Sequence, residues 1–329
     1  MRRGALLSLA LAVTISLGIA LTLAVPPKLA AQDVASLSDR CRLRAPTATT
    51  QCLDGAIAAQ ALLAHTGLLA GLGSDLAGSP TTLGRRIGST PRIALSMRAG
   101  GLSARLPDLT DRQNVPAKEA KFFLPTLHGS VALGVFDGFR LMPTVGGFLS
   151  VDLLAQTSMI FLPKGQGFDG RIGSFSFGAR VGVLRESFTL PGVTLSVSKR
   201  LLGVVRMGSV PLGDPTDVKI DPTVTSYRLA VGKDLFAVGL LLGVGWDSYS
   251  TDARIRVADG AEGVVATEGA LNARRPLFFG GTSLNLLILQ LSAEFGWAKG
   301  FSAPTGYTGA AFDPTRYSLF GSLAARLTI

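Results

Sequence analysis

The chain has 329 residues, of which only 16% are charged and 40 are glycine, and its mean hydropathy is +0.39. An average soluble domain has roughly 25% charged residues, and interior glycines disfavour long helices. The chain is too apolar to be disordered, and two cysteines and two histidines leave little room for a zinc domain. What remains is a β-rich protein with much apolar surface and a net charge of +10.

The amino terminus has the features of a secretory signal peptide. Arg2 and Arg3 precede an apolar run over residues 5–25, and small residues end the segment at Ala31. We predict that residues 1–31 are removed by cleavage after about Ala31. An uncleaved membrane anchor is the alternative, because the apolar run is long enough to span a bilayer.

Cys41 and Cys52 are the only cysteines, and both follow the predicted cleavage point. Because an oxidising compartment pairs such residues, we predict a disulfide between them, with two free thiols as the alternative. A metal or redox site is not predicted, because there is no Cys-x-x-Cys motif and no histidine close by.

Residues 32–90 show no alternation of apolar and polar side chains. Within them, residues 51–72 are rich in alanine and leucine and predict a helix. Thr50 is placed to cap this helix, Asp54 suits its first turn, and Gly71 suits its end. Because the helix has few charges, we expect another part of the protein to cover it.

From about residue 92 onward, large apolar residues alternate with small or polar ones, which in a strand places the two kinds on opposite faces. The clearest run extends from Phe236 to Asp247, where large apolar residues form one face and three glycines lie on the other. About ten runs are found, near residues 93–98, 130–135, 149–156, 174–183, 193–198, 226–231, 236–247, 276–284, 287–297 and 317–329.

Two architectures use this pattern. A soluble sandwich buries the apolar face in its core, whereas a transmembrane barrel turns that face toward lipid. The second face here is mostly Gly, Ala and Ser, which suits a narrow lumen, and several runs are long enough to span a bilayer at a tilt. We therefore predict an all-β, up-and-down antiparallel transmembrane barrel of about ten strands (eight to twelve) over residues 91–329, with a short helical amino-terminal segment.

The connections between the runs also favour a barrel, because long and short ones largely alternate, as outer loops and periplasmic turns do. This parity predicts that both termini lie on the periplasmic side. Three aromatic residues, Trp246, Trp297 and Tyr317, fall near the outer ends of strands, where interfacial girdles lie. The short turns are expected at residues 188–192, 233–234 and 283–285, and the long connections at 100–127, 208–222, 253–270 and 299–314.

The segment from Arg92 to Ile329 resembles bacterial outer-membrane β-barrel proteins, including porin-like and small barrels. The terminal strand, residues 317–329, looks like the carboxy-terminal signal read by the barrel-assembly machinery, although it ends in Ile329 rather than an aromatic residue. The resemblance implies a place in the bacterial outer membrane, with lipid and lipopolysaccharide as partners. Residues 32–90 would then form a lumen plug or a periplasmic cap, with a short periplasmic appendage as the alternative.

Strand parity places a set of polar side chains inside the barrel. We expect four arginines and three carboxylates there to pair with one another and fill the lumen. The alternative is an open polar path that selects solutes, and its positive charge would favour anions. The predicted cluster consists of Arg98, Asp152, Gln156, Arg180, Arg228, Asp247, Glu294 and Arg326.

The sequence gives little sign of catalysis. His128 and Ser130 share one face of a strand, and some outer-membrane lipid hydrolases use a His and a Ser on a barrel wall, but no partner acid is identifiable. A histidine near the membrane interface is the favoured interpretation. We predict no cofactor and no metal. The basic residues are dispersed, so nucleic-acid binding is not predicted either.

The leading functional hypothesis is passive passage or binding of small solutes, apolar or anionic, by an outer-membrane barrel. A structural barrel without an open pore is nearly as well supported, because side chains can fill a lumen of about ten strands. A lipid-acting hydrolase that uses His128 and Ser130 is the third hypothesis.

Overall fold

The computed structural model describes residues 34–84, 91–111, 116–139, 147–164, 167–187, 190–260, 262–301 and 312–329. The predicted signal peptide and its cleavage point lie outside these residues. The helices are α2 (Val34–Arg44), α3 (Thr49–Leu69) and the short 3₁₀ helix η2 (Val210–Leu212). The strands are β1 (Ile93–Pro107), β2 (Glu119–Phe136), β3 (Ser150–Phe161), β4 (Arg171–Leu184), β5 (Gly192–Leu202), β6 (Val205–Met207), β7 (Thr216–Leu235), β8 (Val238–Asp259), β9 (Gly263–Leu286), β10 (Leu289–Ala298) and β11 (Ser318–Thr328).

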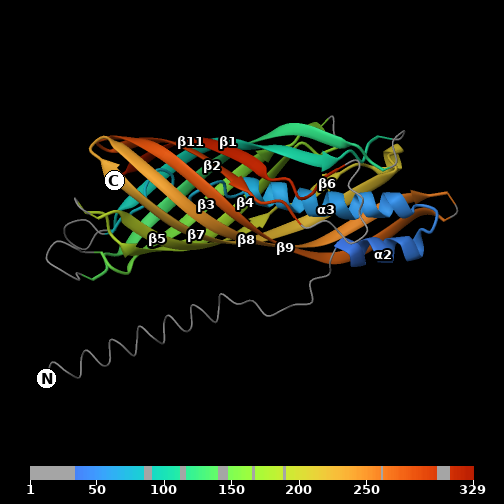
Figure 1. Cartoon of the computed structure of the whole chain (residues 1–329), viewed down its shortest axis with the longest axis horizontal. Coiled ribbons are helices and arrows are strands. Elements are labelled where there is room, and N and C mark those ends of the chain that lie inside the picture. The colour runs from blue at the N-terminus through green and yellow to red at the C-terminus, as the bar shows by residue number, and fades with distance from the viewer. Residues whose placement is uncertain are drawn as a thin grey trace, which may run out of the picture. The chain divides into compact units, whose positions relative to one another are not determined.

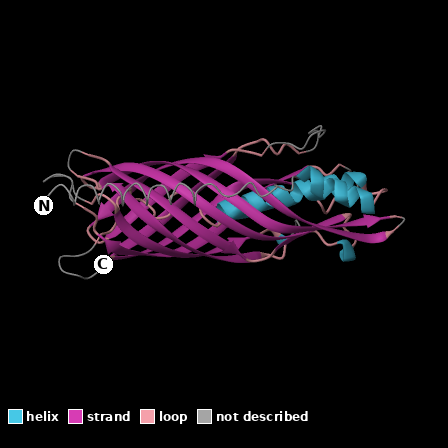
Figure 2. Cartoon of the chain, turned by 90° about the horizontal axis from the view of Figure 1, so that it is seen from below, coloured by secondary structure: helices cyan, strands magenta, loops and turns pink. Residues whose placement is uncertain are grey.

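The strands form a closed antiparallel barrel, as predicted (Figures 1 and 2). Consecutive strands pair from β1 to β5 and from β7 to β11, β5 pairs with β7, and β1 pairs with β11, so that ten strands make a complete ring. The additional strand β6 pairs with β7 at the edge of that ring. Where all ten strands pair, closure leaves no unpaired edge, which a sheet in lipid requires, whereas residues 263–276 of β9 extend beyond this level and pair with β8 alone.

The barrel has two unlike ends. At the short-turn end, Phe236 and Ala237 connect β7 to β8, Leu287 and Ile288 connect β9 to β10, and β11 ends. At the opposite end, which we call the long-hairpin end, β8 and β9 continue until Asp259 pairs with Gly263.

Several predicted connections are therefore wrong. Lys233 and Asp234 lie within β7, and residues 283–285 lie within β9, so both short turns come a few residues later than expected. The connection expected at residues 253–270 is mostly strand, and so is much of that expected at residues 100–127.

Along β8, the outward and inward side chains exchange polarity near Trp246. Toward the short-turn end from this residue, outward side chains are apolar, and Leu242 is 71% exposed. Beyond Trp246, outward residues on β8 are polar, as at Ser250 and Arg254, and the inward ones are apolar, as at Ile255. An apolar exterior over an ordered barrel is the arrangement that lipid requires, so the exchange marks one boundary of the membrane-spanning zone.

Both α-helices lie at the long-hairpin end, where the extended strands enclose α3 and α2 packs against α3 and β9 at the rim (Figure 1). A Cβ added to Gly55 of α3 would meet Ile255, and one added to Gly67 would meet Tyr249. The disulfide between Cys41 and Cys52 joins α2 to α3, which confirms the predicted pair. Most α3 residues are buried on all sides, since the barrel wall covers the helix where water would otherwise meet alanine and leucine.

This placement corrects the expected helix in several respects. Helix α2 was not predicted, and α3 begins at Thr49, with Ala48 rather than Thr50 at its N-cap and no side-chain cap. Asp54 instead accepts a hydrogen bond from the Ala117 N–H (2.9 Å), and burial raises the pKa of its carboxyl group. Position 71 lies beyond the helix, which ends at Leu69.

The chain after α3 runs from the long-hairpin end to the short-turn end through the lumen. Along its length Gly73 approaches Glu294, Gly78 approaches Gln290, and Gly84 approaches Gly134 near the end of β2. The described amino-terminal residues therefore lie at the end opposite to the last strand's carboxyl end. The expectation that both termini share one side is wrong, because strand parity does not register a segment that crosses inside the barrel.

Candidate functional site

The candidate site is the lumen together with residues 70–84, which we call the lumen segment. This segment forms neither helix nor strand, so its backbone N–H and C=O groups lack regular partners. Buried backbone polar groups must nevertheless be hydrogen-bonded, and water has little access to a filled barrel. Side chains on the inner faces of the strands supply the partners.

One carboxylate of the lumen segment, that of Asp75, is held entirely by β5. Arg200 Nη2 donates to Asp75 Oδ1 at 2.8 Å, and Ser198 Oγ donates to the same oxygen at 3.2 Å. Ser196 Oγ donates to Oδ2. Ser196, Ser198 and Arg200 alternate along the strand and all face inward, so one strand face forms a complete carboxylate receptor. Arg200 and Asp75 are both almost fully buried.

Glu294 and Arg98 carry opposite charges, and both bind the first part of the lumen segment. Glu294 Oε2 accepts from the Ser74 N–H (3.0 Å), and Oε1 accepts from the Ser74 hydroxyl and from the Gly78 N–H (3.3 Å). Arg98 donates to the carbonyl oxygens of Leu72 and Ser74 and lies 3.7 Å from Glu294. Donors and acceptors of the segment are thus matched to charges of the correct sign.

Arg228 and Asp247 form a third buried pair, with Nη1 and Oδ1 2.6 Å apart. Arg228 also donates to the carbonyl oxygens of Gly73 (3.1 Å) and Gly71 (3.4 Å). Asp247 therefore acts on the lumen segment through Arg228, which it positions and neutralises.

The last part of the segment is held by a fourth buried pair, that of Arg180 and Asp152. Arg180 Nη2 lies 2.7 Å from Asp152 Oδ2, and its Nη1 donates to the Ser79 carbonyl (3.2 Å). Both Asp152 oxygens accept from the Leu83 N–H at 3.0 to 3.1 Å. Paired in this way, Arg180 and Asp152 compensate each other's charge.

The structure places all eight predicted cluster residues on inward faces. Seven of them bond directly to the lumen segment, including Gln156 to the Ala70 carbonyl (3.0 Å) and Arg326 to the Ala77 carbonyl (3.3 Å). Sequence reasoning missed Asp75, Arg200 and Gln290, the last of which donates to the Gly78 carbonyl (2.9 Å). Arg200 follows Ser196 and Ser198 in strand parity, so extending that run by two residues would have found it.

We expect substitution of Gly134 by valine to displace the lumen segment. A Cβ at this position would lie 2.1 Å from the Gly84 carbonyl oxygen, so backbone must move. Overpacking of this kind costs about 1–3 kcal/mol, measurable as a lower free energy of unfolding in urea titrations of the protein in detergent micelles. The matched control is Gly173→Val on β4, where an added Cβ meets nothing within 4 Å and the change should stay within about 0.5 kcal/mol. Equal effects of the two substitutions would contradict the contact.

His128 and Ser130 do not form a catalytic pair. His128 Nδ1 is bonded to Gln156 Nε2 (2.9 Å), and His128 Nε2 lies 3.3 Å from Thr126 Oγ1. The Ser130 hydroxyl is bonded instead to that of Ser96 (2.5 Å). Both side chains face the lumen, because inward positions repeat every two residues, but each is engaged by a neighbouring strand. The hydrolase hypothesis therefore loses the hydrogen bond between base and nucleophile on which it depended.

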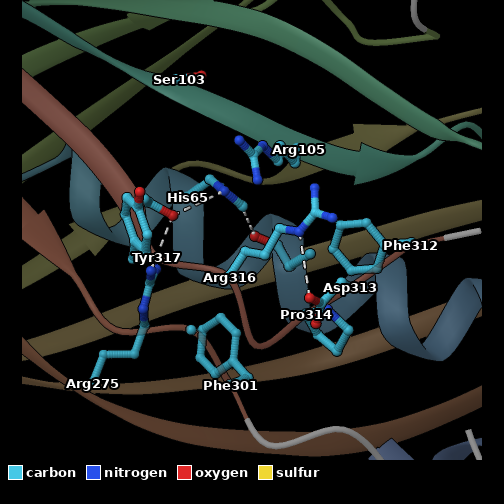
Figure 3. A pocket seen from close by; sticks show the side chains of 13 residues that line it. His65, Ser103, Arg105, Arg275, Phe301, Phe312, Asp313, Pro314, Arg316 and Tyr317 are labelled. Atoms are coloured by element: carbon cyan, nitrogen blue, oxygen red, sulfur yellow. Dashed lines mark hydrogen bonds and ion pairs between the residues drawn. The ribbon is translucent and has the colours of Figure 1, made fainter. Parts of the chain in front are cut away.

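A different histidine, His65 of α3, contacts a serine, Ser318 at the start of β11. Figure 3 shows His65 and the side chains around it. His65 Nδ1 donates to the Ala61 carbonyl (2.6 Å), which leaves Nε2 to accept from the Ser318 hydroxyl (3.4 Å). Arg275 Nη2 donates to Ser318 Oγ (3.1 Å). The adjoining cavity has a volume of about 20 Å³, which is room for little more than a water molecule. We therefore assign these side chains the role of tying α3 to β9 and β11.

The predicted interface aromatics all face outward. Trp246 and Tyr317 are more than half exposed, and Trp297 is 46% exposed and stacks on Phe278 with ring centroids 5.2 Å apart. On β8 the outward residues change from apolar to polar at Trp246. The aromatic residues and the polarity of the strands therefore indicate the same boundary of the membrane-spanning zone.

No protein-family model matches the sequence, and no curated protein is similar to it. Among solved structures, the translocator domain of autotransporter NalP from Neisseria meningitidis has 11% identity and a TM-score of 0.40, over 74% of this chain and 89% of that one. The outer-membrane protease OmpT from Escherichia coli has 10% identity and a TM-score of 0.38, over 76% and 100%. The transport unit of autotransporter AIDA-I from Escherichia coli has 9% identity and a TM-score of 0.36, over 82% and 98%. Such low similarity carries no argument about activity.

The ring of strands and the distribution of side chains on its two faces identify the class of fold. Ten strands close into a ring, large apolar side chains cover the outside of that ring, and charged side chains occupy its inside. A soluble barrel or sandwich places its apolar side chains the other way round. This chain therefore has the fold of an outer-membrane β-barrel protein.

Proposed function

We propose that the protein is a self-plugged barrel of the bacterial outer membrane, one that does not form an open pore and that holds its own amino-terminal helices at the long-hairpin end. The observation that carries the proposal is the lumen segment, whose backbone is bonded by side chains from strands around the ring, among them Arg98, Asp152, Arg228 and Glu294. The proposal replaces free passage of solutes as the leading hypothesis, because the polar lumen side chains that would line a path are committed to this segment.

The long-hairpin end suits a role in binding at the cell surface. β8 continues from Trp246 to Asp259, which corresponds to about 40 Å of strand beyond the aromatic level. Its outward residues there are polar, and its inward residues pack on α3. The barrel would thus act as an anchor, and α2 with the outward side chains of the extended strands would present the contact surface.

Planar-bilayer recording tests the closed lumen. The full-length protein should stay at baseline current, and deletion of residues 34–84 should produce step conductances. Deletion of residues 34–69 alone is the matched control, because it removes the helices and keeps the lumen segment, and it should remain closed. Spontaneous steps from the intact full-length protein would overturn the proposal.

A second candidate is gated passage, in which the lumen segment leaves on a signal. One observation favours it: the segment is held mainly by hydrogen bonds to charged side chains, which can exchange for water, rather than by helix or strand structure of its own. Thr82 Oγ1 and Ser150 Oγ are hydrogen-bonded, so Thr82→Cys with Ser150→Cys provides a reversible lock. Gating predicts channels in the reduced double variant under an applied potential and none after oxidation. Absence of channels in both the reduced and the oxidised state would exclude gated passage and favour a permanently closed barrel.

A further inference from the structure

We propose that the short-turn end of the lumen holds a binding site for a small organic anion that carries a phosphate or carboxylate group. A cavity of about 710 Å³ opens there beside the lumen segment. Cationic side chains dominate its lining, with four of them against two carboxylates. The cations are Arg92, Arg185, Lys233 and Arg326, and the carboxylates are those of Glu186 and Asp234.

Arg326 is the central residue of the site. Its Nη1 donates to the Ala77 carbonyl (3.3 Å), but among the described residues its Nε is buried without a hydrogen-bond partner. No carboxylate within that described part of the chain lies within ion-pair distance of Arg326, and nearby Arg180 is paired with Asp152. A largely buried guanidinium with no carboxylate at ion-pair distance is costly, so an anion that reaches this cavity is stabilised there.

The carboxylates of the cavity balance this charge only in part, because Asp234 attracts Arg326 without forming an ion pair with it and Glu186 is engaged elsewhere. Glu186 is engaged by Lys233, whose Nζ lies 3.7 Å from Oε1, and by the Asp234 N–H (2.6 Å). Among the described residues, the Arg92 side chain donates a single long hydrogen bond, to the Leu83 carbonyl (3.4 Å). Two guanidinium groups thus face the same cavity with donors to spare, an arrangement that matches the oxygens of a phosphate or carboxylate group.

The size and the remaining walls of the cavity indicate that the anion is organic. The volume is within the range of small-molecule sites and far exceeds that of an inorganic ion. Leu83, Leu235 and Phe236 contribute apolar surface, while Thr81, Thr82 and Ser187 contribute hydroxyl groups. A ligand with a carbon skeleton can contact the apolar surface while its anionic group meets Arg92 and Arg326. The site lies at the mouth of the lumen, so it goes beyond the proposed function and requires neither a closed nor an open lumen.

Isothermal titration calorimetry on the full-length folded protein in detergent micelles tests the site. Glucose 6-phosphate and citrate serve as the phosphate and carboxylate probes, and glucose as the neutral control. We expect saturable binding of at least one anion, no binding of glucose, and weaker binding at high ionic strength. The stronger of the two anionic probes identifies the preferred group.

Three variants then locate the binding. Arg326→Gln and Arg92→Gln should each weaken binding at least tenfold, whereas Arg171→Gln, at an exposed position on β4 at the long-hairpin end, should leave it unchanged. Arg92 lies outside the strands, so its variant keeps the test valid if Arg326→Gln disturbs folding. Absence of saturable binding, or binding undiminished in Arg92→Gln, overturns the site. Neither result bears on the baseline conductance that tests the proposed function.

Discussion

Replacing Asp75 with alanine lowers the free energy of unfolding by about 3–5 kcal/mol, the usual cost of leaving one charge of a buried pair alone. Arg200 would remain charged inside the lumen, with Ser226 as its other side-chain partner. Its own side chain is 1% exposed, so water cannot easily solvate it. Urea titration of the protein in detergent micelles, followed by tryptophan fluorescence and by heat-modifiable migration on gels, measures the loss.

The control for Asp75→Ala is Asp169→Ala. Asp169 forms an ion pair with Arg206 at 3.3 Å, but both side chains are more than half exposed, so the change should be no more than about 1 kcal/mol. The double substitution Asp75→Ala with Arg200→Ala should recover part of the stability, since it removes the unpaired charge. An Asp75→Ala variant as stable as Asp169→Ala would show that the lumen pair is hydrated rather than buried.

Substituting Leu242 with arginine should destabilise the barrel by about 2–4 kcal/mol, because it places a charge on the lipid-facing side of β8. Ser250→Arg is the matched control on the same face of the same strand. The two positions lie four residues to either side of Trp246, where the strand exchanges its apolar exterior for a polar one. Ser250→Arg should therefore cost about 0–1 kcal/mol, as charges near the interface do.

Unfolding of both variants from lipid vesicles, rather than from detergent alone, measures this difference. Equal costs at the two positions would mean that Trp246 does not mark the boundary of the membrane. A larger cost at Ser250 would mean that the membrane-spanning zone lies nearer the long-hairpin end.

The barrel was predictable because its signal is local. Alternation of large apolar with small residues, as in the run from Phe236 to Asp247, sets which face meets lipid, and this requires no knowledge of distant residues. The same parity identified the inward residues, and it failed to reach Arg200 only because the run was ended too early. The extension of β8 past Trp246 was missed for a related reason. Polar and apolar residues still alternate beyond Trp246, but there the polar side chains face outward and the apolar ones face inward.

The lumen segment could not be placed in this way. Asp75 meets β5 and Ser74 meets β10, so the contacts join residues far apart in the sequence. The segment has no period of its own, and its need for hydrogen-bond partners becomes specific only when the closed ring fixes the positions of the wall side chains. The side of the barrel on which α3 lies was undetermined for the same reason.

The sequence by itself predicted the membrane-facing surface, the approximate number of strands, the disulfide and the inward position of the charged residues, because each depends on spacing along the chain or on residue type. Only the tertiary structure decided what those charges do. Closure of the ring brings Arg98, Arg228 and Glu294 around one extended backbone, and hydrogen bonding to that backbone becomes the way to satisfy both the charges and the peptide groups in a space with little water. The lumen is thereby filled by the chain's own segment.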